Sequence, residues 1–446
     1  MMRAKIGEWR EIPGPESIKW LQRAKRYLFT TTVDSDIIIA GYEGPYVFDP
    51  DRNCYLDFAS GVGVNSFGGG EKALAHLWET IGSLRYSCGA CGDIGSDWFN
   101  LPAIKAAQYI EKSITSLVSD RNKVYFASSG ERANMAALDL AWNYGGANNF
   151  STRTVVCFEG AFHGREFLTK LLDPRKPERF EHYPLADYPV IRAPFPSASL
   201  KNPLKTLRNF MDKLSKKERI GVDAVIFEPI QGEGGIVVPD SEALRWWVDA
   251  WRNEGVNFII ADEIQTGMGR TGKLMGYEHF GVKPDVVTLS KCLGSGVPVA
   301  VMIGPPWADW EKLGRQSESF SGTPLSSAAA HATLQHVLEH GVLEKNQELG
   351  EYLGQLLLSE LGLFKCIKEI RGKGLMWGVE FCDALFRDKV KDHAEHMGLR
   401  VVSAGFSEDN PTIRIMPTYA VNKEELKLGV ETLARAVCST IKDLNR

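Results

Sequence analysis

Several features that mark special protein classes are scarce in this chain of 446 residues. Eight cysteines are too few for a scaffold stapled by disulfides. The formal net charge of −4 provides no basic field, so nucleic acid is not expected as a partner. The longest apolar runs have about the length of a strand, which argues against a membrane span. The opening segment MMRAKIGEWREIPGPESIKW lacks the apolar stretch of a secretory signal, so we expect a cytoplasmic protein.

Metal-binding patterns are also sparse. Cys88 and Cys91 have the CxxC spacing, but a structural zinc site usually needs a second such pair or nearby histidines, which the neighbouring sequence does not provide. We therefore predict two loop thiols and no metal. What remains is ordinary for a globular protein, with 44% hydrophobic and 24% charged residues. The length predicts two domains.

Residues from about 120 to 305 alternate short apolar runs with helical patterns. The runs are KVYFA, TVVCF, AVIFEPI, NFIIADE, DVVTLS and PVAVMIG. Continuous apolar runs are typical of strands buried on both faces of a parallel sheet. Between them, a helical pattern has one apolar face made of Ala133, Ala136, Ala137, Leu140, Ala141 and Tyr144. A second helix is predicted in DSEALRWWVDAWRNEG, capped by Asp240 or Ser241.

The two ends of the chain have a different pattern. YVFDPDRNCYLDF predicts two short strands joined by a turn, and the C-terminal part mixes long helices with strands such as GLMWGVEF. The proline-containing stretch 173–205 reads as a long surface excursion. We predict an N-terminal segment (1–70) that joins a small domain, a large cofactor-binding domain (71–325) and a C-terminal small domain (326–446).

Unusual residues stand where the predicted strands end, which is where sites form in open parallel sheets. SSGERAN predicts a turn and a helix start whose N–H groups could bind an anion, and Gly130 would allow a phosphate to approach. Phe162 and His163 follow the next strand. An aromatic side chain there could stack on a flat ring, although a core aromatic is the commoner explanation.

A carboxylate and a lysine complete this group. Asp262 and Glu263 close an apolar strand, where an unpaired carboxylate would be costly. Such a carboxylate can pair with a protonated ring nitrogen, as pyridoxal phosphate requires, alongside a Schiff-base lysine. Lys291 ends a later strand and is the candidate, the alternative being a lysine whose stem snorkels to water. Phosphate turn, aromatic, acid and lysine in this order favour a pyridoxal-phosphate site.

These segments resemble the class III (ω-amino acid) family of pyridoxal-phosphate-dependent aminotransferases, and in particular 4-aminobutyrate aminotransferase. The resemblance is carried by SSGERANMAAL, FEGAFHGR, IFEPIQGEGGIVVP, ADEIQTGMGRTGKLMGYEHFGVKPDVVTLSK, SFSGTPLSSAAA and RGKGLMWGVEF. It implies an α/β protein of fold type I, with a mixed, mostly parallel sheet in the large domain and a small α+β domain. It also implies a homodimer, or a dimer of dimers.

The resemblance implies a role for each matching residue. Lys291 would hold the cofactor and act as a base, Asp262 would pair with the pyridinium nitrogen, and Phe162 would stack on the ring. The other implied cofactor contacts are Ser129, Gly130, Glu131, His163, Glu228 and Gln265. Ser319, with Thr323 as a weaker candidate, would reach the phosphate of the neighbouring subunit.

Four positions concern the substrate. Arg165 matches the arginine that binds the distal carboxylate of 4-aminobutyrate. Glu233 and Arg414 match a switch: they pair with each other for an ω-amino substrate and separate when Arg414 binds the α-carboxylate of glutamate or 2-oxoglutarate. A plain structural salt bridge is the alternative. Val62 stands where the aminobutyrate branch has an aliphatic residue and the ornithine branch a tyrosine, which favours 4-aminobutyrate or another ω-amino acid.

The chain departs from its relatives at the phosphate turn and near its substrate entrance. Relatives usually have Ser or Thr and then Glu after the phosphate glycine, whereas this chain has Glu131 and Arg132. A carboxylate repels a phosphate, so we predict that Glu131 points away and contributes only its backbone, with Arg132 offsetting the charge. The histidine-containing turn of the family is replaced by FGGGEKALAHL.

The expected function is transfer of the terminal amino group of a 4-aminobutyrate-like ω-amino acid to a 2-oxoacid such as 2-oxoglutarate, by a ping-pong mechanism. An ornithine or lysine ω-aminotransferase is one alternative. Another is an amino acid racemase, epimerase or aminomutase, because such relatives retain Lys291, Asp262 and Gln265. The donor's chain length and the choice between 2-oxoglutarate and pyruvate stay open.

Overall fold

A computed structural model describes most of the chain, in two compact units. The described residues are 12–28, 35–68, 79, 82, 99–147, 154–172, 189–310, 316–405 and 410–444. One unit, which we call the large unit, is continuous from residue 75 to 343. The other, the small unit, combines residues 1–74 with 344–446. Cys88, Cys91 and most of the FGGGEKALAHL segment lie outside the described residues.

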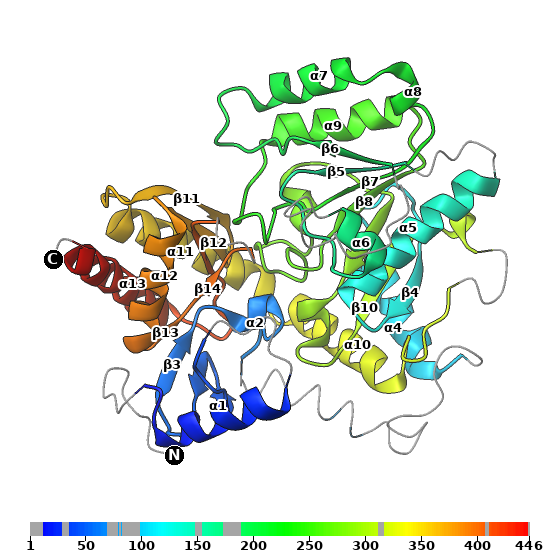
Figure 1. The fold of residues 1–446 in the computed structure, drawn as a ribbon. Coiled ribbons are helices and arrows are strands. Elements are labelled where there is room, and N and C mark those ends of the chain that lie inside the picture. Colours follow the sequence, from blue (N-terminus) through cyan, green and yellow to red (C-terminus); the bar gives the residue numbers. More distant parts are fainter. Residues whose placement is uncertain are drawn as a thin grey trace. The chain divides into compact units, whose positions relative to one another are not determined.

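A seven-stranded sheet forms the centre of the large unit, in the order β4-β10-β9-β8-β7-β5-β6 (Figure 1). Its strands are β4 (Lys123–Ala127), β5 (Thr154–Phe158), β6 (Val190–Ala193), β7 (Val222–Phe227), β8 (Phe258–Asp262), β9 (Val286–Leu289) and β10 (Ala300–Gly304). β10 is antiparallel to both β4 and β9, and the other pairs are parallel. This confirms the predicted mixed, mostly parallel sheet.

All six apolar runs quoted from the sequence contain strands of this sheet, because a strand covered on both faces needs apolar residues at successive positions. The prediction was wrong for part of the supposed surface excursion, since β6 lies within it and pairs with β5, Val190 opposite Val155. The reason is physical. β6 has four residues at the sheet edge, and only Ala193 is fully buried, so its apolar pattern is weak.

Helices cover this sheet. Their bounds in the large unit are α4 (Leu101–Ser113), α5 (Gly130–Ala147), α6 (Phe167–Leu171), α7 (Pro203–Lys213), α8 (Lys216–Arg219), α9 (Ser241–Asn253) and α10 (Pro324–Glu339), with 3₁₀ turns η2 (Gly276–His279), η3 (Lys291–Gly294) and η4 (Pro306–Ala308). The predicted apolar face of α5 is buried against the sheet. Asp240 caps α9 by accepting the Ala243 N–H at 2.8 Å, as predicted. Figure 1 shows α7 beside α9.

The small unit has two four-stranded sheets. One has the order β1 (Gly41–Glu43), β2 (Tyr46–Phe48), β3 (Cys54–Asp57), β13 (Leu399–Arg400), and the other β11 (Ile367–Lys373), β12 (Met376–Phe381), β15 (Thr412–Ile415), β14 (Val402–Ser403). The predicted pair of short strands is the β2–β3 hairpin. The remaining helices are α1 (Pro15–Tyr27), α2 (Ser60–Gly63), α11 (Val342–Leu361), α12 (Ala384–His396) and α13 (Lys423–Leu444). Gly429 lets α13 approach Phe58, whose ring a Cβ would meet at 2.2 Å.

None of the helices in the described part of the chain has the length and apolar composition that crossing a bilayer requires.

Candidate active site

Loops that follow the carboxyl ends of five strands surround one cavity in the large unit, at the position expected for a site in an open α/β sheet. The cavity has a volume of about 250 Å³. Its lining residues are Gly130, Glu131, Phe162, His163, Gly164, Arg165, Glu228, Glu233, Asp262, Ile264, Gln265, Ser290 and Lys291. Ten of the fifteen residues proposed from the sequence are among them, although they come from segments spread over 160 positions of the chain.

Five proposed residues do not line this cavity. Ser129, Ser319 and Thr323 belong to the same unit, while Val62 and Arg414 belong to the small unit. Ser129 accepts the Arg132 N–H at 3.3 Å, and Thr323 caps α10 by accepting the Ser326 N–H at 3.2 Å. Both hydroxyls therefore have helix-capping roles in this chain.

The two residues of the small unit have distinct surroundings. Arg414 is 2% exposed in β15, and its Nη2 donates to the Ser403 carbonyl at 2.8 Å. Val62 has a φ of +59°, a conformation in which a β-branched residue is strained. Strain of this kind is concentrated at functional sites. The switch between Glu233 and Arg414 stays a prediction.

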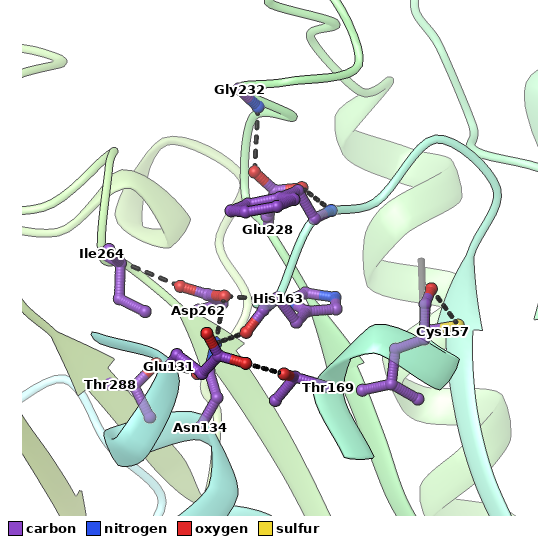
Figure 2. Close-up of polar contacts among 12 residues, drawn as sticks. Glu131, Asn134, Cys157, His163, Thr169, Glu228, Gly232, Asp262, Ile264 and Thr288 are labelled. Carbon is purple, nitrogen blue, oxygen red and sulfur yellow. Dashed lines mark hydrogen bonds and ion pairs between the residues drawn. The ribbon is translucent and has the colours of Figure 1, made fainter. Parts of the chain in front are cut away.

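The Asp262 carboxylate is held by three donors (Figure 2). Its Oδ2 accepts from Asn134 Nδ2 at 2.7 Å and lies 2.8 Å from His163 Nδ1, and its Oδ1 accepts the Ile264 N–H at 3.1 Å. A carboxylate can only accept, so we assign the His163 proton to Nδ1. These bonds compensate for burial of a side chain that is 4% exposed, and they fix its orientation.

Asn134 and Thr288 form a second layer behind Asp262 that the sequence analysis missed. Asn134 Oδ1 accepts the Thr288 hydroxyl at 2.7 Å, and its Nδ2 also donates to the His163 carbonyl at 2.8 Å. The signal was present in the sequence. Asn134 lies about one helical turn after Gly130, and Thr288 is a polar residue within the apolar run VVTL.

The start of α5 has the properties of an anion site. The first N–H groups of a helix have no partner within it, and here Ser129 satisfies those of Arg132 and Ala133. The N–H groups of Gly130 and Glu131, which both line the cavity, find no acceptor among the described residues. Glycine is required at 130 because a Cβ would lie 2.7 Å from the Ile264 side chain.

Lys291 begins the 3₁₀ turn η3 directly after β9. Its φ of +46° is uncommon for a residue other than glycine. Ser290, which precedes it, donates its hydroxyl to the Val299 carbonyl at 2.9 Å. The turn therefore holds the lysine in a strained but supported backbone position at the cavity wall.

Glu228 joins two loops of the cavity. Its carboxyl accepts the N–H groups of Phe162 and Gly232, each at 2.9 Å. Burial, helped by the charge of Asp262, raises the pKa of Glu228 to about 7, against the opposing effects of His163 and the two N–H donors. This carboxyl can therefore carry a proton near neutral pH.

Arg165 and Phe162 lie side by side at the cavity. The guanidinium carbon is 5.6 Å from the centre of the Phe162 ring, and the arginine is exposed. Glu233, which is 5% exposed, also lines the cavity. Gln265 is buried, and its Oε1 has no hydrogen-bond partner in the described structure. A Cβ at position 232 would lie 1.7 Å from that oxygen, so Gly232 is needed for the glutamine to occupy this position.

The aminotransferase class-III family model matches residues 30–437 of this chain. The chain belongs to the class-III aminotransferase family. It is a pyridoxal-phosphate-dependent transaminase of fold type I. Acetylornithine aminotransferase of Caldanaerobacter subterraneus subsp. tengcongensis is 33% identical, with 92% of this chain and 96% of that protein covered.

Two further relatives carry related names. Acetylornithine/succinyldiaminopimelate aminotransferase of Yersinia pestis is 32% identical, covering 90% of this chain and 92% of that protein. Succinylornithine transaminase of Yersinia enterocolitica is 31% identical, covering 93% and 96%. Among solved structures, a transaminase from the marine bacterium Virgibacillus superposes with a TM-score of 0.85 at 20% identity, covering 96% of this chain and all of that one. This last similarity concerns the fold.

The cavity fits pyridoxal phosphate by its own chemistry. Gly130 and Glu131 offer N–H groups for the phosphate, Asp262 offers a buried carboxylate for the ring nitrogen, and Phe162 offers an aromatic face. The unpartnered Gln265 Oε1 can accept a hydrogen bond from a bound ring substituent. Lys291 lines the same cavity and would supply the amine to which such a cofactor attaches.

Proposed function

We propose that this transaminase moves the terminal amino group of an ω-amino acid, and specifically an N-acylated ornithine, to a 2-oxoacid such as 2-oxoglutarate. The proposal rests on one observation above all. Arg165 and Lys291 line the same cavity, so a carboxylate at one end of a substrate and an amine at the other can be bound together. A guanidinium grips a carboxylate through two parallel hydrogen bonds.

The names of the relatives support the choice of substrate. They are called acetylornithine aminotransferase, acetylornithine/succinyldiaminopimelate aminotransferase and succinylornithine transaminase. Each name contains an amino acid with two amines, ornithine or diaminopimelate, of which one carries an acetyl or succinyl group. This favours an ornithine-derived donor over the 4-aminobutyrate expected from Val62.

Each cavity residue has a defined task in this proposal. When bound, pyridoxal phosphate supplies the electron sink that makes the C–H bond beside the amine weak enough to break. Lys291 takes up that proton and returns it. Asn134 and His163 fix the orientation of the Asp262 carboxylate, which would face the ring nitrogen of the cofactor. Arg165 would bind the carboxylate at the far end of the substrate.

The two substrates of the cycle differ in where their carboxylates lie, and we propose that Glu233 and Arg414 accommodate the difference. Arg414 would bind the α-carboxylate of the 2-oxoacid. The variant Arg414→Ala is then expected to slow the 2-oxoglutarate half-reaction at least about tenfold more than the amine half-reaction. Equal slowing of both half-reactions would remove the switch. We also propose a homodimer, which light scattering of the holoenzyme can test. In this dimer Ser319 would face the cofactor phosphate bound by the partner subunit.

The substrate is tested by the half-reaction without any oxoacid. The absorbance of the bound cofactor is followed as N-acetylornithine, ornithine or 4-aminobutyrate is added, with Lys291→Ala as the inactive control. We expect conversion with N-acetylornithine at the highest kcat/KM, followed by recovery of the starting spectrum with 2-oxoglutarate. An unchanged spectrum with N-acetylornithine would refute the donor. Racemisation of an amino acid without oxoacid would replace transfer by isomerisation.

A further inference from the structure

The side chain of Glu131 has a function that the phosphate turn alone does not explain. Its Oε1 accepts the backbone N–H of Glu166 and the hydroxyl of Thr169, both from the start of α6. Figure 2 shows the contact with Thr169. Thr169 is fully buried. The carboxylate is therefore turned away from the N–H groups of α5 and bound to the segment that follows Arg165.

The chain around Arg165 is fixed on both sides. Before it, the Phe162 N–H donates to Glu228 at 2.9 Å, and the His163 carbonyl accepts from Asn134 at 2.8 Å. After it, the Glu166 N–H donates to Glu131, and the Glu166 carbonyl accepts from α6 itself, the Thr169 hydroxyl at 3.0 Å and the Lys170 N–H at 2.8 Å. Between these anchors stands Gly164, with a φ of +144° that favours glycine. Without the second anchor, this glycine would give the arginine backbone rotational freedom.

Packing at the same place supports a close fit. A Cβ on Gly164 would lie 2.6 Å from the Glu131 carboxylate and 2.4 Å from the Thr169 hydroxyl oxygen. The other ionic contacts nearby are longer and more exposed. Arg132 lies 3.8 Å from Glu166, with side chains 44% and 58% exposed, and such pairs contribute little. The bonds to Glu131 are charge-assisted and involve a buried partner, so they dominate.

We propose that Glu131 is a positioning residue for Arg165. By tying Glu166 and Thr169 to the start of α5, it fixes the guanidinium at the cavity and so sets the preference for donors that carry a carboxylate remote from the reacting amine. This inference rests on the proposed role of Arg165. It also explains how a carboxylate is tolerated beside a phosphate-binding turn, because its oxygen is already engaged by two donors.

The test compares two donors that differ by one carboxylate, 5-aminopentanoate and pentylamine, on the holoenzyme. Glu131→Gln keeps the shape but loses the charge. We expect it to lower kcat/KM for 5-aminopentanoate about tenfold more than kcat/KM for pentylamine, mainly through a higher KM for 5-aminopentanoate. Thr169→Val keeps the volume and removes one donor, so a rise in the same KM of about threefold is expected.

The matched control is Glu166→Gln, which keeps the backbone N–H that donates to Glu131. It should change kcat/KM for either amine donor by no more than about twofold. Hydrogen exchange provides a readout that does not depend on turnover. The Glu166 amide should exchange faster in Glu131→Gln than in the parent protein, while amides of β8 and β9 keep their protection.

The outcomes separate the two proposals. If the parent protein does not prefer 5-aminopentanoate over pentylamine, the role of Arg165 fails and this inference fails with it. If the parent does discriminate but Glu131→Gln affects both donors equally, or leaves the Glu166 amide as protected as before, only the role of Glu131 is overturned. Should Glu131→Gln fold poorly, Thr169→Val alone decides the matter by the same comparison of donors.

Discussion

Asp262 and Glu263 are adjacent, both are nearly fully buried, and yet their surroundings differ in kind. Because successive residues of an extended segment point to opposite sides, one carboxylate faces the cavity and the other faces the loop beyond β8. Asp262 is held mainly by the side chains of Asn134 and His163. Glu263 accepts the backbone N–H groups of Gly276 at 2.9 Å and Tyr277 at 2.8 Å.

The difference shows two uses of a buried carboxyl at one strand end. The carboxylate of Asp262 lines the cavity, whereas Glu263 organises its own loop, with the Thr266 hydroxyl at 2.6 Å as a third donor. Burial raises the pKa of Glu263 to about 7, although its three hydrogen-bond donors oppose the shift. We therefore expect substitutions at the two positions to affect different measurable quantities.

The largest effect is expected on the cavity side. Asp262→Asn removes the charge that we propose would pair with the pyridinium nitrogen and should lower kcat by about 10³-fold or more. The neighbouring Glu263→Gln variant is the matched control, with kcat expected within about threefold of the parent. Steady-state kinetics of both variants test the contrast, and similar losses of kcat in the two would contradict it.

The support behind Asp262 comes next. Asn134→Ala leaves the Thr288 hydroxyl without its acceptor and removes one of the two donors to Asp262 Oδ2, the other being His163. We expect kcat to fall about tenfold, and the free energy of unfolding to fall by about 1–3 kcal/mol because buried polar groups lose a bond. Urea denaturation and kinetics measure the two quantities. Thr288→Val, which leaves the Asn134–Asp262 bond in place, should have the smaller effect on kcat.

On the loop side the expected effect is on the pH dependence of stability. The pKa of Glu263 is raised from its ordinary value of 4.5 to about 7, so the folded state holds a proton that the unfolded state has lost between these pH values. The contribution of this protonated carboxyl to the free energy of unfolding is fully present below pH 4.5 and is lost as the pH rises through 7. For one such group, the loss between pH 5 and 8 is about 2 kcal/mol.

Glu228 has a similarly raised pKa of about 7, and burial also raises the pKa of Asp285, so these carboxyls share the pH-dependent loss. Glu263→Gln should remove its own part of that loss, about 2 kcal/mol between pH 5 and 8. Urea midpoints at pH 5 and pH 8 measure the slope in both proteins. A slope as steep in the variant as in the parent would show that Glu263 does not hold this proton.

The smallest expected effect concerns Glu278, whose charge contributes to the raised pKa of Glu263. Its own carboxylate accepts the Ser116 hydroxyl at 3.1 Å. Glu278→Gln should lower the pKa of Glu263 slightly and shift the pH at which stability declines toward lower values, by less than about one unit. The same urea series measures the shift, and a shift toward higher pH would be the wrong sign.

Much of this arrangement was predictable from the sequence. The strands were recognised because residues such as Val225 and Ile260 occur in unbroken apolar runs, and the order of strand ends predicted that Lys291 and Asp262 would meet. β6 was missed because an edge strand of four residues has little apolar pattern. This error comes from the short edge strand itself and does not depend on the family resemblance.

The contacts of Asn134 and Glu131 could not be predicted in the same way. Asn134 bonds to residues 29, 128 and 154 positions away, and only the assembled sheet brings them together. The sequence suggested that Glu131 would turn away from a phosphate, but its destination at Thr169 lies on another helix, 38 positions along the chain. The sequence next to such a residue can predict which way its side chain points, but it cannot predict a partner that lies far along the chain.

The antiparallel strand β10 has a consequence for biosynthesis. It lies between β4 and β9, so within the sheet the strand before Gly130 and the strand before Lys291 are joined through β10, which ends at Gly304. Chains emerge from the ribosome N-terminus first, and contacts between distant residues form slowly. The strand before Gly130 and the strand before Lys291 therefore share a sheet only after β10 has been synthesised, so the sheet beneath the cavity is completed after the last lining residue of the cavity has emerged.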